Sequence, residues 1–226
     1  MKVYGLVPAY NEERNIREVV RRIKKIGITP IVIDDASRDD TYRLAKSTKS
    51  VVLRHKKNLG KGEAIRTGLK FLRKRRFDYV ILIDADMQYL PEEAPKLLKP
   101  LVGGQADFVA GFRDFKSVPF IRHRLGNFVW RTSFNVLFGT KFKDTNCGFV
   151  AMNRRAADVI MRKISGGYIL ENSMFIEVIK NRLRAHQVPV TVKYHRGSAV
   201  PRGMRVVAGV TFYILHQGIR HRLGIR

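Results

Sequence analysis

Two aspartates in the middle of the chain have the spacing of a metal site. Residues 79–83 read Tyr-Val-Ile-Leu-Ile, a strand-like apolar run, and Asp84 and Asp86 come directly after it. Residues i and i+2 of an extended chain point to the same side, so both carboxylates can contact one divalent cation beyond the strand. The alternative is that these acidic residues only cap the strand, as they do in many α/β proteins.

Polar loops follow four other strand-like runs. They lie at residues 8–13, 34–37, 55–61 and 111–113, and they carry acidic, basic and amide side chains. Because Asp and Ser favour helix N-caps, capping explains Asp34, Asp35 and Ser37 one at a time. It does not explain why the loop after every strand carries such groups, which favours a shared binding site.

Alternating strand-like and helix-like runs position these loops. Apolar patterns predict strands at residues 3–7, 31–33, 51–53, 79–83 and 108–110. Between them they predict helices at 15–25, 61–73 and 92–101 and a short helix after residues 39–40. Runs of β-branched residues without polar alternates indicate strands that are covered on both faces. We therefore predict an α/β fold, a Rossmann-like and mostly parallel sheet with helices on both faces, whose five loops open on one ligand-binding edge.

The alternation weakens after residue 115. The sequence predicts an aromatic-rich helix at about 125–138, a strand at 149–152 and a helix at 154–161, with no shift in composition that marks a domain boundary. We predict one catalytic domain over residues 1–200 and a basic, amphipathic segment over residues 201–226. The apolar run at 206–215 is shorter than the roughly 20 residues of a membrane-spanning helix. The segment therefore fits either a membrane surface or an ordinary buried C-terminal helix.

The charge of the chain calls for an anionic partner. The formal net charge is +25, from 44 Lys and Arg against 19 Asp and Glu. Nucleic acid, an anionic membrane surface and a phosphorylated substrate all meet this requirement. No nucleic-acid-binding motif is present, and a nucleic-acid-binding protein has no use for carboxylates at the ends of its strands. We therefore expect no nucleic-acid partner. The single cysteine, Cys147, and the early polar residues predict a cytoplasmic protein without an export signal.

The cysteine and the histidines are not predicted to take part in catalysis or to bind a metal. Four of the six histidines, at positions 55, 123, 186 and 195, lack metal-ligand spacing, which predicts surface or structural roles for them. Cys147 stands beside Gly148 and fits a packed small residue better than a nucleophile.

Six segments of the chain carry a family pattern. They are Val7-Pro8-Ala9-Tyr10-Asn11-Glu12-Glu13, Asp34-Asp35-Ala36-Ser37, Asn58-Leu59-Gly60-Lys61-Gly62, Asp84-Ala85-Asp86-Met87-Gln88, Gly111-Phe112-Arg113 and Asp144-Thr145-Asn146-Cys147-Gly148-Phe149. Together they resemble the family 2 glycosyltransferases, and among them the dolichol-phosphate mannose synthase and polyprenyl-phosphate glycosyltransferase branch. The resemblance covers residues 3–198, with the segments in the family's order. It implies the GT-A fold, a nucleotide-binding α/β sheet with an acceptor-binding C-terminal half.

The resemblance implies a donor site position by position. Asp35 would accept hydrogen bonds from the uridine or guanosine moiety, and Asp84 would lie near the sugar and ribose. Asp86, helped by Gln88 and next to Asp84, would hold Mg²⁺ or Mn²⁺ against the diphosphate. The other donor-binding positions are the pocket residues Pro8, Tyr10 and Glu12 and the turn residues Gly60, Lys61 and Gly62.

The resemblance also implies an acceptor side. Arg113 would approach the acceptor phosphate or the donor diphosphate, and Arg196 would clamp phosphate. A carboxylate near residues 168–172 often acts near the acceptor in this family, and we favour Glu171 over Glu177. One departure is Tyr89, which stands where the family usually has His after the Gln of the metal-binding segment.

The predicted reaction is an inverting, metal-dependent hexose transfer from GDP-mannose or a UDP-sugar to a polyprenyl or dolichyl phosphate. Such an acceptor is already ionised at neutral pH, so a strong general base is unnecessary. A soluble or glycan hydroxyl acceptor is the alternative, and it would need a carboxylate base, for which Asp144 and Glu171 are the candidates. We expect peripheral attachment to an anionic membrane surface at the cytoplasmic face.

Overall fold

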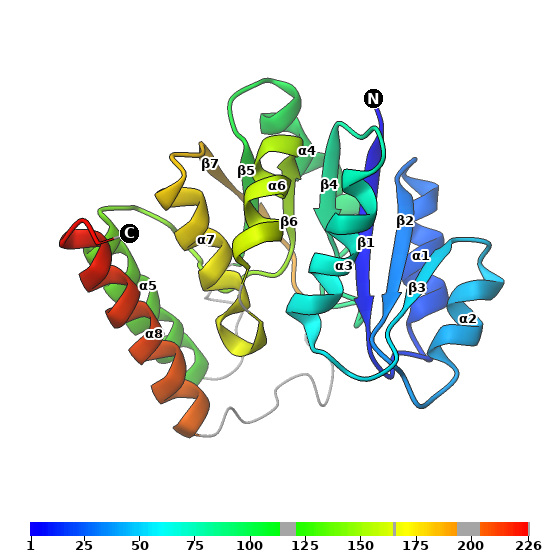
Figure 1. The fold of residues 1–226 in the computed structure, drawn as a ribbon, viewed down its shortest axis with the longest axis horizontal. Coiled ribbons are helices and arrows are strands. Elements are labelled where there is room, and N and C mark those ends of the chain that lie inside the picture. Colours follow the sequence, from blue (N-terminus) through cyan, green and yellow to red (C-terminus); the bar gives the residue numbers. More distant parts are fainter. Residues whose placement is uncertain (114–120, 165, 194–203, 226) are drawn as a thin grey trace.

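A seven-stranded sheet organises the molecule (Figure 1). The structure is a computed structural model, and it describes residues 1–113, 121–164, 166–193 and 204–225, without the side chains of residues 121–126 and 204–206. The strand order is β3-β2-β1-β4-β6-β5-β7. The strands are β1 (Val3–Ala9), β2 (Thr29–Asp34), β3 (Val51–Arg54), β4 (Tyr79–Leu82), β5 (Phe108–Arg113), β6 (Val150–Asn153) and β7 (Ala185–Val190).

All strands except β6 run in the same direction. β1 pairs in parallel with β2 and β4, β2 with β3, and β5 with β7, whereas β6 is antiparallel to both β4 and β5. The carboxyl ends of β1 to β5 therefore meet at one edge of the sheet. This confirms the predicted mostly parallel α/β fold.

Helices cover both faces of the sheet because neighbouring residues of each strand point to opposite faces. In β1, Leu6 packs into the cluster that includes α3 (Lys61–Arg73), whereas Val7 packs into the cluster that includes α1 (Ile16–Lys25). The face of α3 also carries α6 (Arg154–Lys163) and α7 (Leu170–Lys180), and the face of α1 also carries α2 (Thr41–Ser47) and α4 (Ala94–Val102) (Figure 1).

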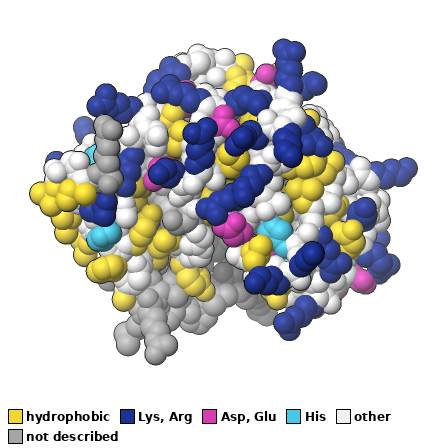
Figure 2. Space-filling view, viewed as in Figure 1, with side chains coloured by type: hydrophobic (Ala, Val, Ile, Leu, Met, Phe, Trp, Pro, Cys, Tyr) yellow, Lys and Arg dark blue, Asp and Glu magenta, His cyan; other side chains and the backbone are white. Residues whose placement is uncertain are grey.

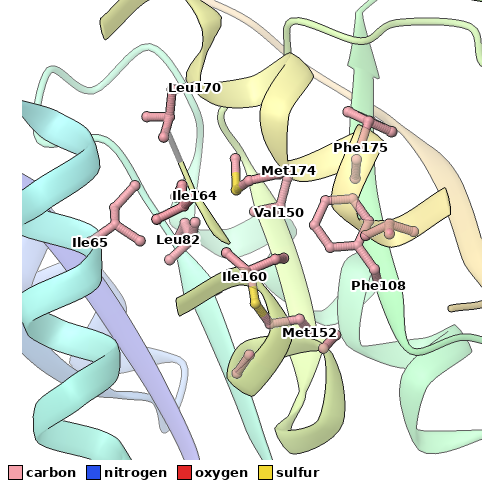
Figure 3. Close-up of a cluster of buried hydrophobic side chains, with 14 of the residues drawn as sticks. Ile65, Leu82, Phe108, Val150, Met152, Ile160, Ile164, Leu170, Met174 and Phe175 are labelled. Atoms are coloured by element: carbon pink, nitrogen blue, oxygen red, sulfur yellow. The ribbon is translucent and has the colours of Figure 1, made fainter. Parts of the chain in front are cut away.

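A buried cluster holds α7 beside α3. Figure 3 shows Ile65 of α3, Leu82 of β4, Val150 of β6 and Met174 of α7 directed into one apolar region. All four side chains are at most 1% exposed. Burying each of them stabilises the fold by roughly 1.5–3 kcal/mol. This packing brings the amino-terminal turns of two helices, remote in sequence, to the same end of the sheet.

Helix α8 (Met204–Arg222) packs on the core of the fold. It lies along α5 (Ile121–Phe138) (Figure 1), and the indole Nε1 of Trp130 donates to Thr211 Oγ1 at 2.9 Å. Val210 and Ile214 of α8 are each 1% exposed and belong to the α3-side core. None of the helices within the described residues has both the length and the apolar character that crossing a membrane requires.

Two elements, α7 and β7, had no counterpart among the predicted ones. β7 reads Ala-His-Gln-Val-Pro-Val, and Pro189 is unusual in a strand because it lacks a backbone N–H. Among the residues that the structure describes, β7 is the last strand in the sheet order and pairs only with β5, and edge strands tolerate proline.

Candidate active site

The loops at the carboxyl edge are bent and bonded to one another. Asn11, Ala36 and Met87 follow β1, β2 and β4 and have positive φ angles of 55°, 61° and 62°. The backbone N–H of Asn11 donates to Ser37 Oγ at 3.0 Å, and Arg38 N–H donates to Asn11 Oδ1 at 2.9 Å. Left-handed backbone at non-glycine residues is strained and tends to cluster at functional sites.

A pocket of about 260 Å³ opens between these loops. Seven of the residues that the sequence placed at the donor site line it together, although they come from four separate loops. They are Pro8, Tyr10, Glu12, Asp35, Lys61, Asp84 and Asp86.

Negative charges face one another in this pocket. Burial raises the pKa of Glu12, and the charges of Asp86 and Asp84 raise it further. Burial also raises the pKa of Asp86, with a second contribution from the charge of Asp84. Each of these carboxylates would be stabilised in its ionised form by a cation placed between them.

The acidic side chains of the pocket suit a magnesium or manganese ion whose remaining ligands are oxygens of the substrate. Within the described residues no group of three or more His, Cys, Asp or Glu side chains could hold a metal ion. Magnesium sites commonly use one or two carboxylates together with substrate phosphates. The Asp86 carboxylate fits this role, because burial and the Asp84 charge raise its pKa and its Oδ1 is oriented by the Gln88 N–H at 3.0 Å. Gln88 therefore supports Asp86 through its backbone N–H.

Lys61 supplies a fixed positive charge at the inner end of the pocket. Its Nζ lies 2.7 Å and 3.0 Å from the two Asp84 oxygens and 3.2 Å from Glu171 Oε1. Burial alone would lower the pKa of Lys61, but the Asp84 and Glu171 carboxylates outweigh burial and raise it. Lys61 is therefore a permanent cation. A Cβ on Gly148 would lie 2.9 Å from both Asp84 Oδ2 and Lys61 Nζ, so only glycine leaves room for this ion pair.

Asp35 is held by protein donors. It is 3% exposed, and it accepts hydrogen bonds from Leu59 N–H at 2.9 Å and Gly60 N–H at 2.7 Å. His55 Nδ1 lies 2.6 Å from the same carboxylate, and His55 Nε2 lies 2.9 Å from Thr67 Oγ1 of α3. Asp35 thus anchors the loop that begins α3 and positions Lys61. His55 therefore has a structural role, as predicted, and it has this role as part of the hydrogen-bond network around Asp35.

Two of the predicted catalytic residues form an ion pair with each other. Arg113 donates from Nε to Asp144 Oδ2 at 2.6 Å and from Nη2 to Asp144 Oδ1 at 3.0 Å. Burial would lower the pKa of Arg113, but the Asp144 charge raises it overall. Asp144 is 1% exposed and also accepts from Asn146 N–H at 2.9 Å. Glu171, in contrast, contacts the pocket through Lys61.

A buried amide next to Glu171 escaped the sequence analysis. Asn172 is 0% exposed and donates from Nδ2 to Asn146 Oδ1 at 2.9 Å. It therefore links α7 to the loop that also carries Asp144. The only signal in the sequence was its position beside Glu171. The remaining predicted phosphate ligand, Arg196, lies outside the described residues.

Known proteins resemble this chain in sequence and in fold. An uncharacterised protein of Methanocaldococcus jannaschii is 36% identical over 204 residues, which cover 84% of this chain and 88% of the relative. The UDP-N-acetylglucosamine–dolichyl-phosphate N-acetylglucosaminyltransferase of Methanococcus voltae is 28% identical over 246 residues, which cover 98% and 96% of the two chains.

A solved structure matches the fold over nearly the whole chain. Glucosyl-3-phosphoglycerate synthase from Mycobacterium tuberculosis, in complex with Mn²⁺, UDP-glucose and phosphoglyceric acid, has a TM-score of 0.78 at 24% identity. The match covers 96% of this chain and 79% of that one. The family model described as glycosyl transferase family 2 matches residues 6–161. The chain therefore belongs to glycosyl transferase family 2 and is a glycosyltransferase with the GT-A fold that its motifs predicted.

Proposed function

We propose that this glycosyltransferase moves a hexose from a nucleotide diphosphate sugar to a polyprenyl or dolichyl phosphate, with inversion at the anomeric carbon. The observation that carries the proposal is the pocket in which Glu12, Asp84 and Asp86 face one another beside the fixed Lys61 cation. The name of the Methanococcus voltae relative, which this chain matches over 98% of its length, supports a dolichyl phosphate acceptor and favours a uridine over a guanosine nucleotide.

The acidic pocket would hold the donor through its diphosphate. Asp86, next to Asp84, would bind Mg²⁺ or Mn²⁺, and such an ion acts as a Lewis acid toward phosphate oxygens when bound. Pro8 and Tyr10 line the pocket and would contact the nucleoside, with Asp35 holding the adjacent loop in place. The Lys61 ammonium would stabilise charge that develops on the leaving diphosphate, because preorganised charges act strongly where water is excluded.

The acceptor needs no strong base if it is a phosphate. A lipid phosphate is ionised at neutral pH, so its oxygen can displace the diphosphate in one step once it is aligned. Asp144 is already paired with Arg113, and Glu171 is paired with Lys61. These ion pairs fit positioning roles for both carboxylates better than proton abstraction. One-step displacement inverts the anomeric carbon.

We also propose that the chain attaches peripherally to an anionic membrane at the cytoplasmic face. Apolar side chains gather along the α8 side of the molecule, while Lys and Arg cover much of the same face (Figure 2). Val136, Ile219 and Leu223 are 65%, 52% and 68% exposed. Each basic side chain near an anionic surface contributes about 1 kcal/mol of attraction.

The test is a transfer assay with a panel of donors and acceptors. Purified protein is incubated with UDP- and GDP-sugars, Mn²⁺, and either a polyprenyl phosphate or the soluble acceptor 3-phosphoglycerate, and products are identified by mass spectrometry. We expect a glycolipid from one UDP-sugar, and none in EDTA. Transfer to the soluble acceptor alone would contradict the lipid assignment while leaving the enzyme class intact. Product of retained anomeric configuration would contradict one-step displacement.

A further inference from the structure

An apolar groove runs between the start of α7 and the first half of α8. Its volume is about 500 Å³, and one wall is the short 3₁₀ helix η3 (Gly167–Ile169) that leads into α7. Tyr168 of η3 and Phe212 of α8 flank the groove and are 59% and 71% exposed. Large aromatic side chains left in water on both sides of an apolar groove indicate a ligand surface.

The groove adjoins the donor pocket. Its lining includes Gly166, and a Cβ built on Gly62 of α3 would lie only 2.7 Å from the Gly166 Cα, so these two segments touch. Gly62 follows Lys61, which lines the donor pocket, and Lys61 binds Glu171, three residues after Tyr168. The groove therefore begins close to Lys61 and Glu171 of the donor side.

A glycine keeps the groove open. Gly209 lies on the groove side of α8, and a Cβ at this position would meet no atom within 4 Å. The next residue, Val210, is 1% exposed and packs into the core. Glycine is unfavourable in a helix interior, and no close packing requires it here.

We propose that this groove binds the isoprenoid chain of the lipid phosphate acceptor. The identity of the acceptor rests on the proposed function, but the groove is a separate site from the donor pocket. An apolar chain is the ligand that gains most from leaving water for such walls. Because the groove begins beside Lys61 and Glu171, the phosphate end of the chain would face the donor sugar while the isoprene units lie along Gly209 and Phe212.

The first experiment fills the groove without disturbing the fold. G209L adds a side chain into open space, and leucine also favours a helix. The acceptors are prenyl phosphates of two and eleven isoprene units in the same detergent. For the unmodified protein we expect KM to fall at least tenfold with the longer chain. In G209L this gain should be lost, with kcat on the short acceptor and KM for the nucleotide sugar unchanged. G209A, which adds one methyl group, should keep most of the gain.

The second experiment measures binding without catalysis. A prenyl phosphate that carries a photoreactive group at its far end is irradiated with the protein, and the labelled peptides are identified. Label on the peptides of Tyr168 or Phe212, reduced several-fold in F212S but not in the control V102S, supports the groove. Val102 is a suitable control because it is 55% exposed at the end of α4, on the other face of the sheet.

Failure of the two proposals gives different results. If the protein glycosylates prenyl phosphates but G209L keeps the full chain-length effect, or if the label lies elsewhere, the groove assignment is wrong and the function stands. If no prenyl phosphate is glycosylated, the proposed function fails, and label in the groove still supports a site for an isoprenoid chain. Label on the same peptides from a photoreactive anionic phospholipid in vesicles, undiminished by excess prenyl phosphate, would show that the groove contacts the bilayer, which overturns the proposal.

Discussion

Acidic groups at the two edges of the sheet have opposite pKa shifts when Glu12 and Asp86 of the pocket are compared with Asp107. At the carboxyl edge, burial and neighbouring negative charges raise the pKa values of Glu12 and Asp86. At the amino edge, Asp107 just before β5 is 3% exposed and accepts hydrogen bonds from Arg184 N–H and Asn153 Nδ2, both at 2.9 Å. Burial would raise its pKa, but Arg184 and Asn153 lower it to about 2.

The direction of the pKa shift distinguishes an acidic residue that stabilises the fold from acidic residues that are suited to bind a cationic ligand. Asp107 joins β5 to the start of β7 and to the end of β6, and its charge is compensated within the protein. Asp86 and Glu12 reduce the stability of the free protein, because their charges repel one another without full compensation. Perturbed acidic groups in a cleft are typical of functional sites.

The largest expected effect is the loss of activity in D86N. Removal of the carboxylate that is proposed to bind the metal should lower kcat/KM by about 10³-fold, or about 4 kcal/mol of transition-state stabilisation. The free energy of unfolding without metal should stay constant or rise, because a repulsive charge is removed. Steady-state assays and urea unfolding in EDTA measure both quantities. A clear loss of stability would place Asp86 with the structural group that Asp107 represents.

K61M tests how much the ion pairs of Lys61 with Asp84 and Glu171 at the carboxyl edge contribute to stability. It leaves Asp84 and Glu171 facing each other without the ammonium, and it should lower the free energy of unfolding by about 2–3 kcal/mol. The partly exposed Lys61 side chain places the cost below that of a fully buried pair. The double variant K61M/E171Q should recover part of the loss. If the double variant is no more stable than K61M, Glu171 is not the partner that the structure shows.

D107N should have the opposite pattern of effects to D86N, with lower stability and retained activity. Loss of the charge that Arg184 and Asn153 stabilise should cost about 2 kcal/mol of stability. The transfer activity should be retained below the melting temperature, since Asp107 lies at the edge opposite the pocket. Thermal unfolding and an activity assay at a low temperature separate the two effects. Activity that falls as far as in D86N would break the distinction between the edges.

The smallest expected effect is the pH dependence of stability. A carboxyl group whose folded pKa is raised binds more protons in the native state than in the unfolded state, so stability rises as pH falls through the folded pKa. Free protein should therefore become more stable from neutral pH toward the ordinary pKa values of 4.5 for Glu12 and 3.8 for Asp86. Below about 3.8, protonation of Asp107 should begin to remove stability, until pH falls through its pKa of about 2.

Denaturant titrations in EDTA at several pH values measure this trend. The rise should be smaller in D86N and should disappear with saturating Mn²⁺, because the ion stabilises the charged form. If the unmodified protein and D86N show the same slope between pH 7 and pH 4.5, the raised pKa of Asp86 does not contribute.

The local pattern of the chain was sufficient to place the polar loops on one edge. Strand-like runs each ended in a polar loop, and a parallel sheet places such loops on one edge whatever the details of packing. The family resemblance then assigned residues of four of these loops to the donor site, and the structure brings seven of them together in one pocket. α7 and β7 escaped because α7 is buried on most of its surface, with polar Asn172 and Ser173 among the buried residues, and because β7 contains Pro189. Neither sequence therefore shows the period of its element.

The partners of the charged side chains were decided by tertiary structure. Lys61 and Glu171 are 110 residues apart, and Arg113 and Asp144 are 31 apart, so no local pattern relates the members of either pair. Hydrophobic periodicity depends on neighbours within one turn or one pleat and is visible in the sequence. The choice of a partner depends instead on which remote helices pack side by side. Here the burial of Ile65, Leu170 and Met174 in one core places Glu171 beside Lys61.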